Sequence, residues 1–345
     1  MAAQYVDSDR RNFDPHLTPG ETFYGFGSTT RFEYQGEAQL IPGYFAVFGA
    51  QHLRSQLTTD TPAWDVVLSP TQAHTTQDSA YGQIKGVVLP GLTVETGLRY
   101  DDDQSYGGHV TAQASAVQAL NGGDTLVRAS FGQGFKAPAL YQLYGPYGAI
   151  TEHMAALKPE TSDSWDLGVQ QFLFSKTVNL SATYFGRDTK GLITYVAPGV
   201  YANIGRATAA GLELQAEWRL DAQLTLTANY TFDRARDLTD HVALIRRPRD
   251  AANLSLAYTW PIRLNTSLAV RYSGSSPDTG YDALGNAFGA PLKAYTVVDI
   301  RAAYPLTERL ELFGRVENLF NQHYETAYPY GSPGVGGFAG VRARF

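Results

Sequence analysis

The sequence predicts an all-β protein, a transmembrane antiparallel β-barrel with about 15 or 16 strands. Three observations lead to this prediction: apolar and polar residues alternate, aromatic residues lie at the ends of the alternating segments, and the connections are unequal in length. Residues 224–233 show the alternation clearly, since Leu, Leu, Ala, Tyr and Phe alternate with Thr, Thr, Asn, Thr and Asp. Successive side chains of a strand point to opposite faces, so this segment has one apolar and one polar face.

The same alternation recurs along the chain, whereas helical periodicity is nowhere sustained. The apolar sets, in chain order, are Leu92, Val94, Leu98 and Tyr100; Val178, Leu180, Ala182 and Tyr184; Leu254, Leu256, Tyr258 and Trp260; Leu268, Val270 and Tyr272; Val298, Ile300, Ala302 and Tyr304; and Leu310, Leu312 and Val316. Polar residues such as Ser, Thr, Asn, Arg and Glu occupy the positions between them. Each set therefore predicts a strand with two different faces.

Strand length and aromatic placement distinguish a membrane barrel from a soluble β-sandwich, the alternative that shares this alternation. The alternating segments run for roughly 10 to 15 residues, whereas strands of soluble proteins usually have about 5 or 6. Aromatic residues recur at strand ends, where membrane barrels have interfacial girdles. These residues are Tyr100, Trp165, Trp218, Phe232, Trp260, Tyr272 and Tyr304. We therefore expect the apolar face to contact lipid and the polar face to line a lumen.

The connections give the order and direction of the predicted strands. Very short ones, such as 41–43 and 89–91, alternate with mostly longer ones, such as 59–78 and 275–293. This asymmetry is typical of outer-membrane barrels, which have short periplasmic turns and longer outer loops. The fifteen predicted strands are 23–40, 44–58, 79–89, 92–103, 107–119, 124–134, 161–174, 178–196, 201–219, 224–235, 250–260, 264–274, 294–304, 309–317 and 335–345. Residues 2–10 are a weaker candidate for a sixteenth strand, which the even strand number of bacterial barrels favours.

Composition excludes several other classes of protein. The chain has 345 residues, a formal net charge of −6 and no cysteine. The absence of cysteine excludes disulfides, thiolate metal sites and a cysteine nucleophile. The negative charge argues against a nucleic-acid partner, whose phosphates would need basic residues. The seven histidines are scattered, and no serine-nucleophile, phosphate-loop or dinucleotide motif is present, so we do not expect an enzyme.

Three stretches resemble a known family. They are RASFGQGFKAPALYQLY at 128–144 with LKPETS at 157–162, YANIGRATAAGLE at 201–213, and VENLFNQHYETAY at 316–328 with the ending GVRARF at 340–345. In this order and spacing they resemble the barrel of TonB-dependent outer-membrane receptors, over about residues 90–345. The ending most resembles the cobalamin receptor branch, with siderophore and haem receptors close to it.

This resemblance implies a protein of the bacterial outer membrane that takes up cobalamin or a metal chelate of siderophore or haem type. The intact family has a plug domain, a segment that TonB binds and a barrel of 22 strands. We therefore expect residues 1–22 to be a partial strand or loop, and 23–345 to be a barrel portion without a plug, not competent for energised transport alone. The alternative is a self-contained, porin-like passive channel of about 16 strands. The terminal Phe345 resembles the signal that the barrel assembly machinery reads.

The outer loops are expected to bind the ligand, because loops on a rigid scaffold carry recognition. Tyrosine offers a large amphipathic contact surface with little rotamer entropy to lose. The candidate ligand-binding residues are Tyr141, Tyr144, Tyr147, Tyr281, Tyr328 and Tyr330; the alternative for each is girdle or loop packing. At the end of another outer loop, Arg246, Arg247 and Arg249 are expected to contact lipopolysaccharide phosphates or an anionic ligand, or else to be inward-facing charges at a strand end.

Two further sets of charges complete the predicted sites. Expected lumen ion pairs, on the polar faces of adjacent strands, involve Asp299, Arg301, Glu311, Arg315 and Glu317. Asp101, Asp102 and Asp103 follow one another at the outer end of a strand, which predicts either a weak Ca²⁺ site or a solvated acidic loop. We expect no other cofactor. The expected partners are outer-membrane lipid, lipopolysaccharide, the barrel assembly machinery and a small-molecule ligand.

Overall fold

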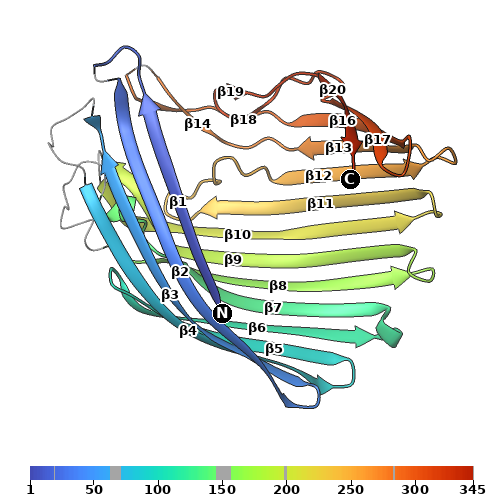
Figure 1. Ribbon diagram of the computed structural model, residues 1–345, viewed down its shortest axis with the longest axis horizontal. Coiled ribbons are helices and arrows are strands. Elements are labelled where there is room, and N and C mark those ends of the chain that lie inside the picture. The colour runs from blue at the N-terminus through green and yellow to red at the C-terminus, as the bar shows by residue number, and fades with distance from the viewer. Residues whose placement is uncertain (19, 63–70, 145–156, 198–199, 283, 345) are drawn as a thin grey trace. The chain divides into compact units, whose positions relative to one another are not determined.

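The structure is a computed structural model that describes residues 1–18, 20–62, 71–144, 157–197, 200–282 and 284–344. Sixteen strands pair in one sheet, in the order β1-β2-β3-β4-β5-β6-β7-β8-β9-β10-β11-β12-β13-β16-β17-β20 (Figure 1). Their bounds are β1 (Ala2–Phe13), β2 (Glu21–Ile41), β3 (Tyr44–Asp60), β4 (Thr71–Leu89), β5 (Leu92–Asp103), β6 (Gly107–Leu120), β7 (Thr125–Lys136), β8 (Glu160–Leu173), β9 (Val178–Ala197), β10 (Val200–Arg219), β11 (Leu224–Asp237), β12 (Asp250–Thr259), β13 (Asn265–Ser273), β16 (Tyr295–Pro305), β17 (Leu310–Glu317) and β20 (Gly336–Ala343). The predicted all-β, sheet-forming fold is confirmed.

Shorter elements lie in the connections between these strands. Two small hairpins form, one from β14 (Thr279–Tyr281) with β15 (Ala287–Gly289), the other from β18 (Glu325–Ala327) with β19 (Tyr330–Gly331). The α-helix α1 covers Leu140–Tyr144. Among the described residues, no helix has both the length and the apolar character needed to cross a membrane.

The first strand of the sheet is the weak sixteenth candidate of the sequence. We predicted a short strand over residues 2–10, and the structure places β1 over Ala2–Phe13. β1 pairs antiparallel with β2, from Ala2 opposite Glu33 to Phe13 opposite Glu21. The sixteenth strand is therefore confirmed, and it is longer than predicted.

The outer ends of β3 and β4 differ from the prediction. We predicted a loop over 59–78, but β4 begins at Thr71 and its first residues continue the ladder with β3, with Thr59 opposite Thr71. The sequence TQAHTTQD of 71–78 is polar on both faces, so it has no alternation from which a strand could be predicted. Backbone pairing with β3, which does not depend on side-chain polarity, extends the strand here.

The chain consists of two compact units. The first unit comprises residues 1–117, 129–165 and 187–207, and the second comprises 118–128, 166–186 and 208–345. In the first unit, the polar face of the sheet is linked across strands by side-chain hydrogen bonds. Tyr81 donates its hydroxyl to Glu33 (3.0 Å) and lies 3.1 Å from Gln35, and Gln113 donates to Gln83 (3.2 Å).

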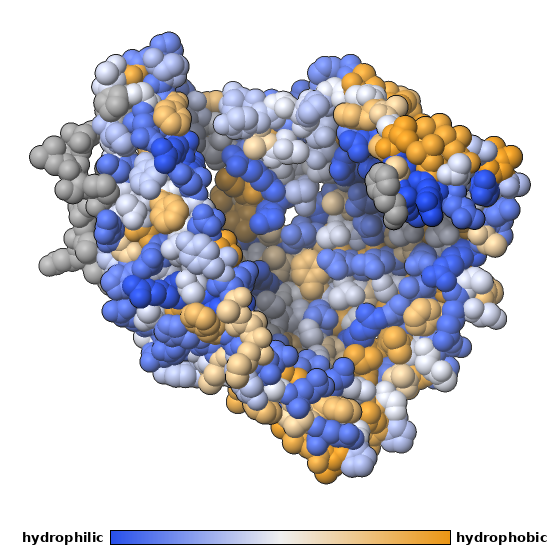
Figure 2. Space-filling model, viewed as in Figure 1, coloured by the Kyte–Doolittle hydropathy of each residue, from blue (hydrophilic) through white to orange (hydrophobic). Residues whose placement is uncertain are grey.

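In the second unit, strand register gives the sheet two distinct faces. Leu226 lies opposite Leu256, and Leu256 lies opposite Leu268, so these side chains form one row on the apolar face. On the polar face, the Asn253 amide donates to the Asn229 carbonyl oxygen (2.9 Å). The apolar row is solvent-accessible rather than covered by protein, with Leu256 37% exposed. Figure 2 likewise shows hydrophobic residues at the surface. An accessible apolar sheet face is what lipid contact requires.

The two faces predict opposite responses to a new charge. Replacing Leu256 by Arg puts a charge on the apolar face and is expected to destabilise the protein by about 2–4 kcal/mol, the cost of an arginine near the bilayer midplane. Replacing the neighbouring Ser255 by Arg puts the same charge on the polar face and should change the free energy of unfolding by less than about 1 kcal/mol. Denaturant unfolding in lipid vesicles measures both. Equal losses of unfolding free energy for the two variants would show that the apolar and polar faces are assigned wrongly.

Candidate ligand-binding loops

A buried carboxylate joins three outer connections of the second unit. Asp278, which is 3% exposed, lies in the connection between β13 and β16. Arg246, from the connection between β11 and β12, donates its Nε–H to both carboxylate oxygens (2.9 and 3.0 Å). The backbone N–H groups of Thr279 and Tyr328 also donate to this carboxylate, each at 2.8 Å. Tyr328 belongs to the connection between β17 and β20, so one side chain holds all three segments together.

The hydrogen bonds to Asp278 favour its ionised form. The pKa of the carboxyl group lies below its ordinary value, chiefly because of the Tyr328 N–H, and further because of the Thr279 N–H and the Arg246 guanidinium. Burial acts in the opposite direction but is outweighed. The backbone of Arg246 is fixed as well, since its N–H donates to the Pro277 carbonyl at 2.8 Å. Asp278 is therefore a charged, fully occupied junction rather than a free ligand-binding acid.

A second polar junction closes the β17–β20 connection at its base. Asn318 has a φ of +51°, a left-handed conformation that Asn tolerates better than most residues. Its side chain donates to the carbonyls of Gln322 (2.9 Å) and Pro333 (3.2 Å) and accepts the Gln322 N–H (2.8 Å). Its own N–H donates to the Asp299 carboxylate on β16 (2.9 Å). The loop is thus fixed to the sheet by hydrogen bonds that one asparagine makes.

A pocket of about 700 Å³ opens between the β13–β16 and β17–β20 connections. Its aromatic and ionisable lining residues are Phe288, Lys293, His323, Tyr324, Glu325 and Tyr328, and the rest of the lining is small, aliphatic or uncharged polar. Ring contacts order its walls, with Tyr328 edge-on to Phe288 at 5.7 Å between centroids and Tyr324 stacked on Tyr295 at 4.2 Å. The volume lies within the range typical of small-molecule sites.

Gly280 allows two of these rings to approach the backbone. A Cβ at this position would lie 2.5 Å from Cζ of Phe288 and 2.8 Å from Cε1 of Tyr328. Any side chain at residue 280 would therefore displace the rings. Because Gly280 follows Asp278 by two residues, the same short segment fixes the Tyr328 backbone and leaves space for its ring.

The structure separates the six predicted ligand-binding tyrosines. Tyr328 lines the pocket, whereas Tyr281 (69% exposed) and Tyr330 (73% exposed) lie on the loop surface nearby. Tyr141 and Tyr144 belong to α1 in the first unit, where Tyr141 contacts Phe23 edge-on. Tyr147 lies outside the described residues, as does Phe345. No sequence pattern pointed to Asp278, Gly280, Phe288 or Lys293, because they come from a loop without periodicity.

The three predicted anion-binding arginines have different surroundings. Arg246 is paired with Asp278 of the neighbouring connection, while its own side chain is 49% exposed. The Arg249 guanidinium lies over the Phe232 ring, 4.7 Å from its centroid. Arg247 is exposed. The run therefore does not form one site.

The predicted charges on the polar face lie on β16 and β17 and belong to a wider set of ion pairs. Arg315 pairs with Glu317 at 2.9 Å, Glu311 pairs with Arg342 of β20, and Asp299 is 3.9 Å from Arg271 of β13. Arg301 lies directly opposite Arg315 in the strand register. The pairs of Glu311 and Asp299 join neighbouring strands, the Arg315–Glu317 pair lies within β17, and all three pairs are on one face.

The aspartates at 101–103 do not converge on one point. Asp101 and Asp103 are buried, whereas Asp102 is exposed, as strand alternation requires. Arg99 and Ser79 both donate to Asp101, at 2.9 and 2.7 Å, and Thr75 donates to Asp103 at 2.9 Å. Within the described part of the chain, no three His, Cys, Asp or Glu side chains group to hold a metal ion. Two of the three carboxylates that we considered for Ca²⁺, those of Asp101 and Asp103, accept hydrogen bonds from neighbouring side chains.

Asp278→Asn is expected to loosen the β17–β20 connection while leaving the sheet intact. Asn keeps the size of the side chain but removes the charge that attracts Arg246 and strengthens both N–H bonds. Hydrogen exchange at the amides of Thr279 and Tyr328 should become about tenfold faster or more. Asp282→Asn is the matched control, since among the described residues the Asp282 side chain accepts its hydrogen bonds within its own turn, from Leu284 and Asn286. Equal effects of both substitutions on the Tyr328 amide would contradict the junction.

The same junction predicts a pH dependence. The pKa of Asp278 is lower in the folded protein than in the unfolded chain. The ionised carboxylate therefore contributes its full stabilisation of the junction above the ordinary aspartate pKa of about 3.9, and this stabilisation is lost as the pH falls through the lower, folded value. Protection of the Tyr328 amide, corrected for intrinsic exchange, should stay constant from neutral pH to about 4 and then decrease. The Asp278→Asn variant should lack this decrease. A transition well above pH 4 in the unsubstituted protein would be inconsistent with the junction.

Comparison with known proteins agrees with this architecture. Residues 2–319 match the family described as TonB dependent receptor-like, beta-barrel. Among solved structures, the siderophore receptor PirA from Acinetobacter baumannii has a TM-score of 0.82 at 18% identity over 99% of this chain. The FrpB iron transporter from Neisseria meningitidis has a TM-score of 0.82 at 17% identity over 99%. The ferric enterobactin receptor PfeA from Pseudomonas aeruginosa has a TM-score of 0.78 at 18% identity over 99%.

The chain spans 59% of the length of each of these three structures. At 17 or 18% identity, their similarity shows the fold alone. The family match covers most of the chain and agrees with the alternating strands and the unequal connections. The chain therefore belongs to the TonB-dependent receptor-like β-barrel family, a family of outer-membrane proteins.

Proposed function

We propose that this chain is the barrel portion of an outer-membrane receptor that takes up a metal chelate of the siderophore type. The observation that carries the proposal is the pocket of about 700 Å³ between the β13–β16 and β17–β20 connections. The Asp278 carboxylate holds the backbone of Tyr328, one of the aromatic lining residues, so the pocket is formed before a ligand arrives. A preformed pocket loses less entropy when it binds than a loop that must order.

The composition of the pocket suits a chelate that is both aromatic and anionic. Phe288, Tyr324 and Tyr328 offer flat surfaces for planar groups, and the tyrosines add hydroxyl groups for hydrogen bonds. Lys293 supplies a positive charge for an anionic group, the Glu325 carboxylate in the same lining partly offsets it, and the His323 ring adds nitrogen atoms for hydrogen bonds. Ferric complexes of catecholates combine planar rings with negative charge. The siderophore and iron-transport roles in the names of the similar structures point to the same class of ligand.

The cobalamin branch suggested by the ending of the sequence is the second ligand class to test. Cobalamin carries no net negative charge that Lys293 would attract, whereas a ferric tris-catecholate does. A direct comparison of ferric chelates with cyanocobalamin on the same protein therefore separates the two classes.

The test is a binding titration on the intact protein, extracted from outer membranes and followed by intrinsic fluorescence. Its probes are ferric enterobactin, a ferric hydroxamate and cyanocobalamin. We expect a ferric chelate to bind and Tyr328→Ala to weaken it by about tenfold or more, since truncation of a central aromatic contact costs roughly 1.5–3 kcal/mol. Tyr330→Ala, on the exposed surface of the same loop, should change the affinity less than about twofold.

Two results would overturn this proposal. One is binding of cyanocobalamin without binding of either ferric chelate. The other is chelate binding that Tyr328→Ala and Tyr330→Ala weaken equally, which would place the ligand away from the pocket.

A further inference from the structure

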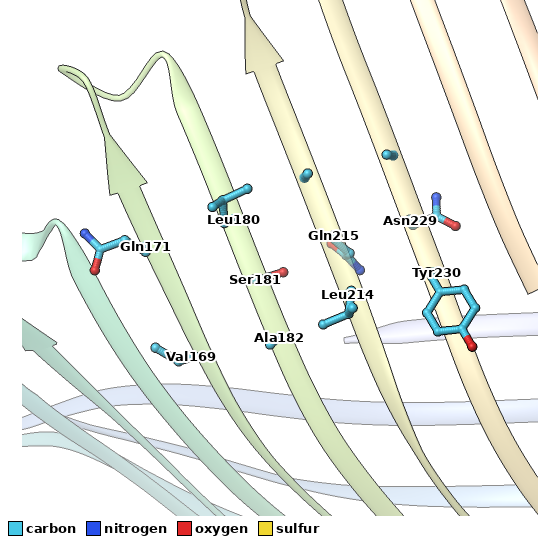
Figure 3. A pocket seen from close by; sticks show the side chains of 11 residues that line it. Val169, Gln171, Leu180, Ser181, Ala182, Leu214, Gln215, Asn229 and Tyr230 are labelled. Carbon is cyan, nitrogen blue, oxygen red and sulfur yellow. The ribbon is translucent and has the colours of Figure 1, made fainter.

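The apolar face of the second unit has a groove that the loop pocket does not explain. It has a volume of about 420 Å³ and crosses β8, β9, β10 and β11. The side chains that shape it on this face are Leu180, Ala182, Leu214, Ala216, Ala228 and Tyr230. Figure 3 shows Leu180, Leu214 and Tyr230 as the larger side chains on neighbouring strands. The small Ala182 lies between Val169 and Leu214. The alanines create the depression because they leave space that leucines would fill.

Three arginines lie on the same face beyond the outer end of this groove. Arg234 and Arg236 follow Ala228, Tyr230 and Phe232 at every second position of β11, so their side chains project from the apolar face. Both are exposed, and within the described residues neither side chain has an ion pair or a hydrogen bond. Arg249 joins them, because its guanidinium lies over the Phe232 ring at 4.7 Å.

One acidic residue shares this face at the same level. Asp250 lies opposite Phe232 in the register, and the Tyr230 hydroxyl donates to it at 2.6 Å. Asp233 and Asp237 are on β11 at the alternate positions and therefore belong to the other face. Because the patch has three guanidinium groups and one carboxylate, its net charge is positive. The carboxylate, that of Asp250, already accepts a hydrogen bond from Tyr230.

The distance between groove and arginines matches the thickness of one lipid leaflet. Ala228 and Arg234 are six residues apart, which is about 20 Å along a strand. With a strand tilt of about 40°, this becomes roughly 15 Å along the membrane normal, half of the ~30 Å hydrocarbon core. The groove therefore lies near mid-membrane when the arginines reach the head-group level. Since β11 runs from a short turn toward a long connection, that level is the outer leaflet.

We propose that this face is a binding site for a phosphorylated lipid of the outer leaflet, with its phosphate on Arg234, Arg236 and Arg249 and an acyl chain in the alanine-lined groove. Guanidinium groups bind phosphate through paired, charge-assisted hydrogen bonds. In the outer leaflet of an outer membrane, the lipid with this chemistry is the phosphorylated glycolipid anchor of lipopolysaccharide. The sequence analysis named Arg246, Arg247 and Arg249 for such a contact; of these, the proposed site includes only Arg249, because Arg246 is paired with Asp278, and it adds Arg234 and Arg236.

The experiment measures lipid binding to the intact protein after its own lipids have been exchanged for detergent. The probes are diphosphoryl lipid A, the same lipid after dephosphorylation, phosphatidylcholine, and inorganic phosphate as a competitor. We expect the protein to bind lipid A well above the other two lipids and to release none of it to millimolar inorganic phosphate. The double variant Arg234→Gln/Arg236→Gln should bind lipid A about thirtyfold more weakly, the loss expected for two basic residues at a membrane surface.

Two matched controls separate a specific site from a change in charge or in folding. Arg263→Gln/Arg309→Gln removes the same charge from the short turns at the opposite strand ends and should leave lipid A binding within twofold. Ala216→Phe fills the groove without changing charge and should weaken lipid A binding about tenfold, whereas Ala339→Phe on the apolar face of β20 should not. Equal binding of dephosphorylated lipid A, displacement by inorganic phosphate, or equal effects of each variant and its control would overturn the proposal.

Discussion

The structure depends on one constraint: in lipid, every backbone N–H and C=O group must find its partner within the protein. Pairing between neighbouring strands meets this constraint, and it fixes the side chains at the same time. Leu226, Leu256 and Leu268 form one row on the apolar face because the ladders between β11, β12 and β13 hold them in register. Asn229 and Asn253 meet on the polar face for the same reason. Two opposite surfaces thus result from a single pattern of backbone bonds.

Outside the membrane, water can bond free backbone groups, so this constraint no longer applies. In the loops, hydrogen bonds from side chains order the backbone instead. Asp278 accepts hydrogen bonds from Arg246, Thr279 and Tyr328, and Asn318 closes its own loop onto the sheet through Asp299. These junctions convert three long connections into a surface with a defined pocket. The shape of the proposed chelate site therefore depends on the hydrogen bonds of Asp278 and Asn318, and the paired strands hold the connections that make these bonds.

Arg246 and Arg249, in the same connection, make different kinds of contact. Arg246 has a φ of +56°, and its side chain reaches Asp278 within the loop cluster. Three residues later, Arg249 lies over Phe232 at the border of the apolar face. The first arginine stabilises the loops near the proposed chelate pocket, and the second contributes to the proposed lipid site. The two side chains thus have different partners although only two residues lie between them.

The sequence by itself determined fifteen strands and their two faces, because alternation with a period of two is a local property that lipid imposes on each strand. Its motifs pointed to the family, and for the sixteenth strand it offered a weaker candidate. It did not predict the extension of β4 over 71–78, where both faces are polar and pairing with β3 alone decides. Of the pocket it named only Tyr328. Only the tertiary structure brought Asp278 to Tyr328, which are 50 residues apart in the chain. Contacts of that kind have no periodicity, so they arise only when the paired strands place their connections side by side.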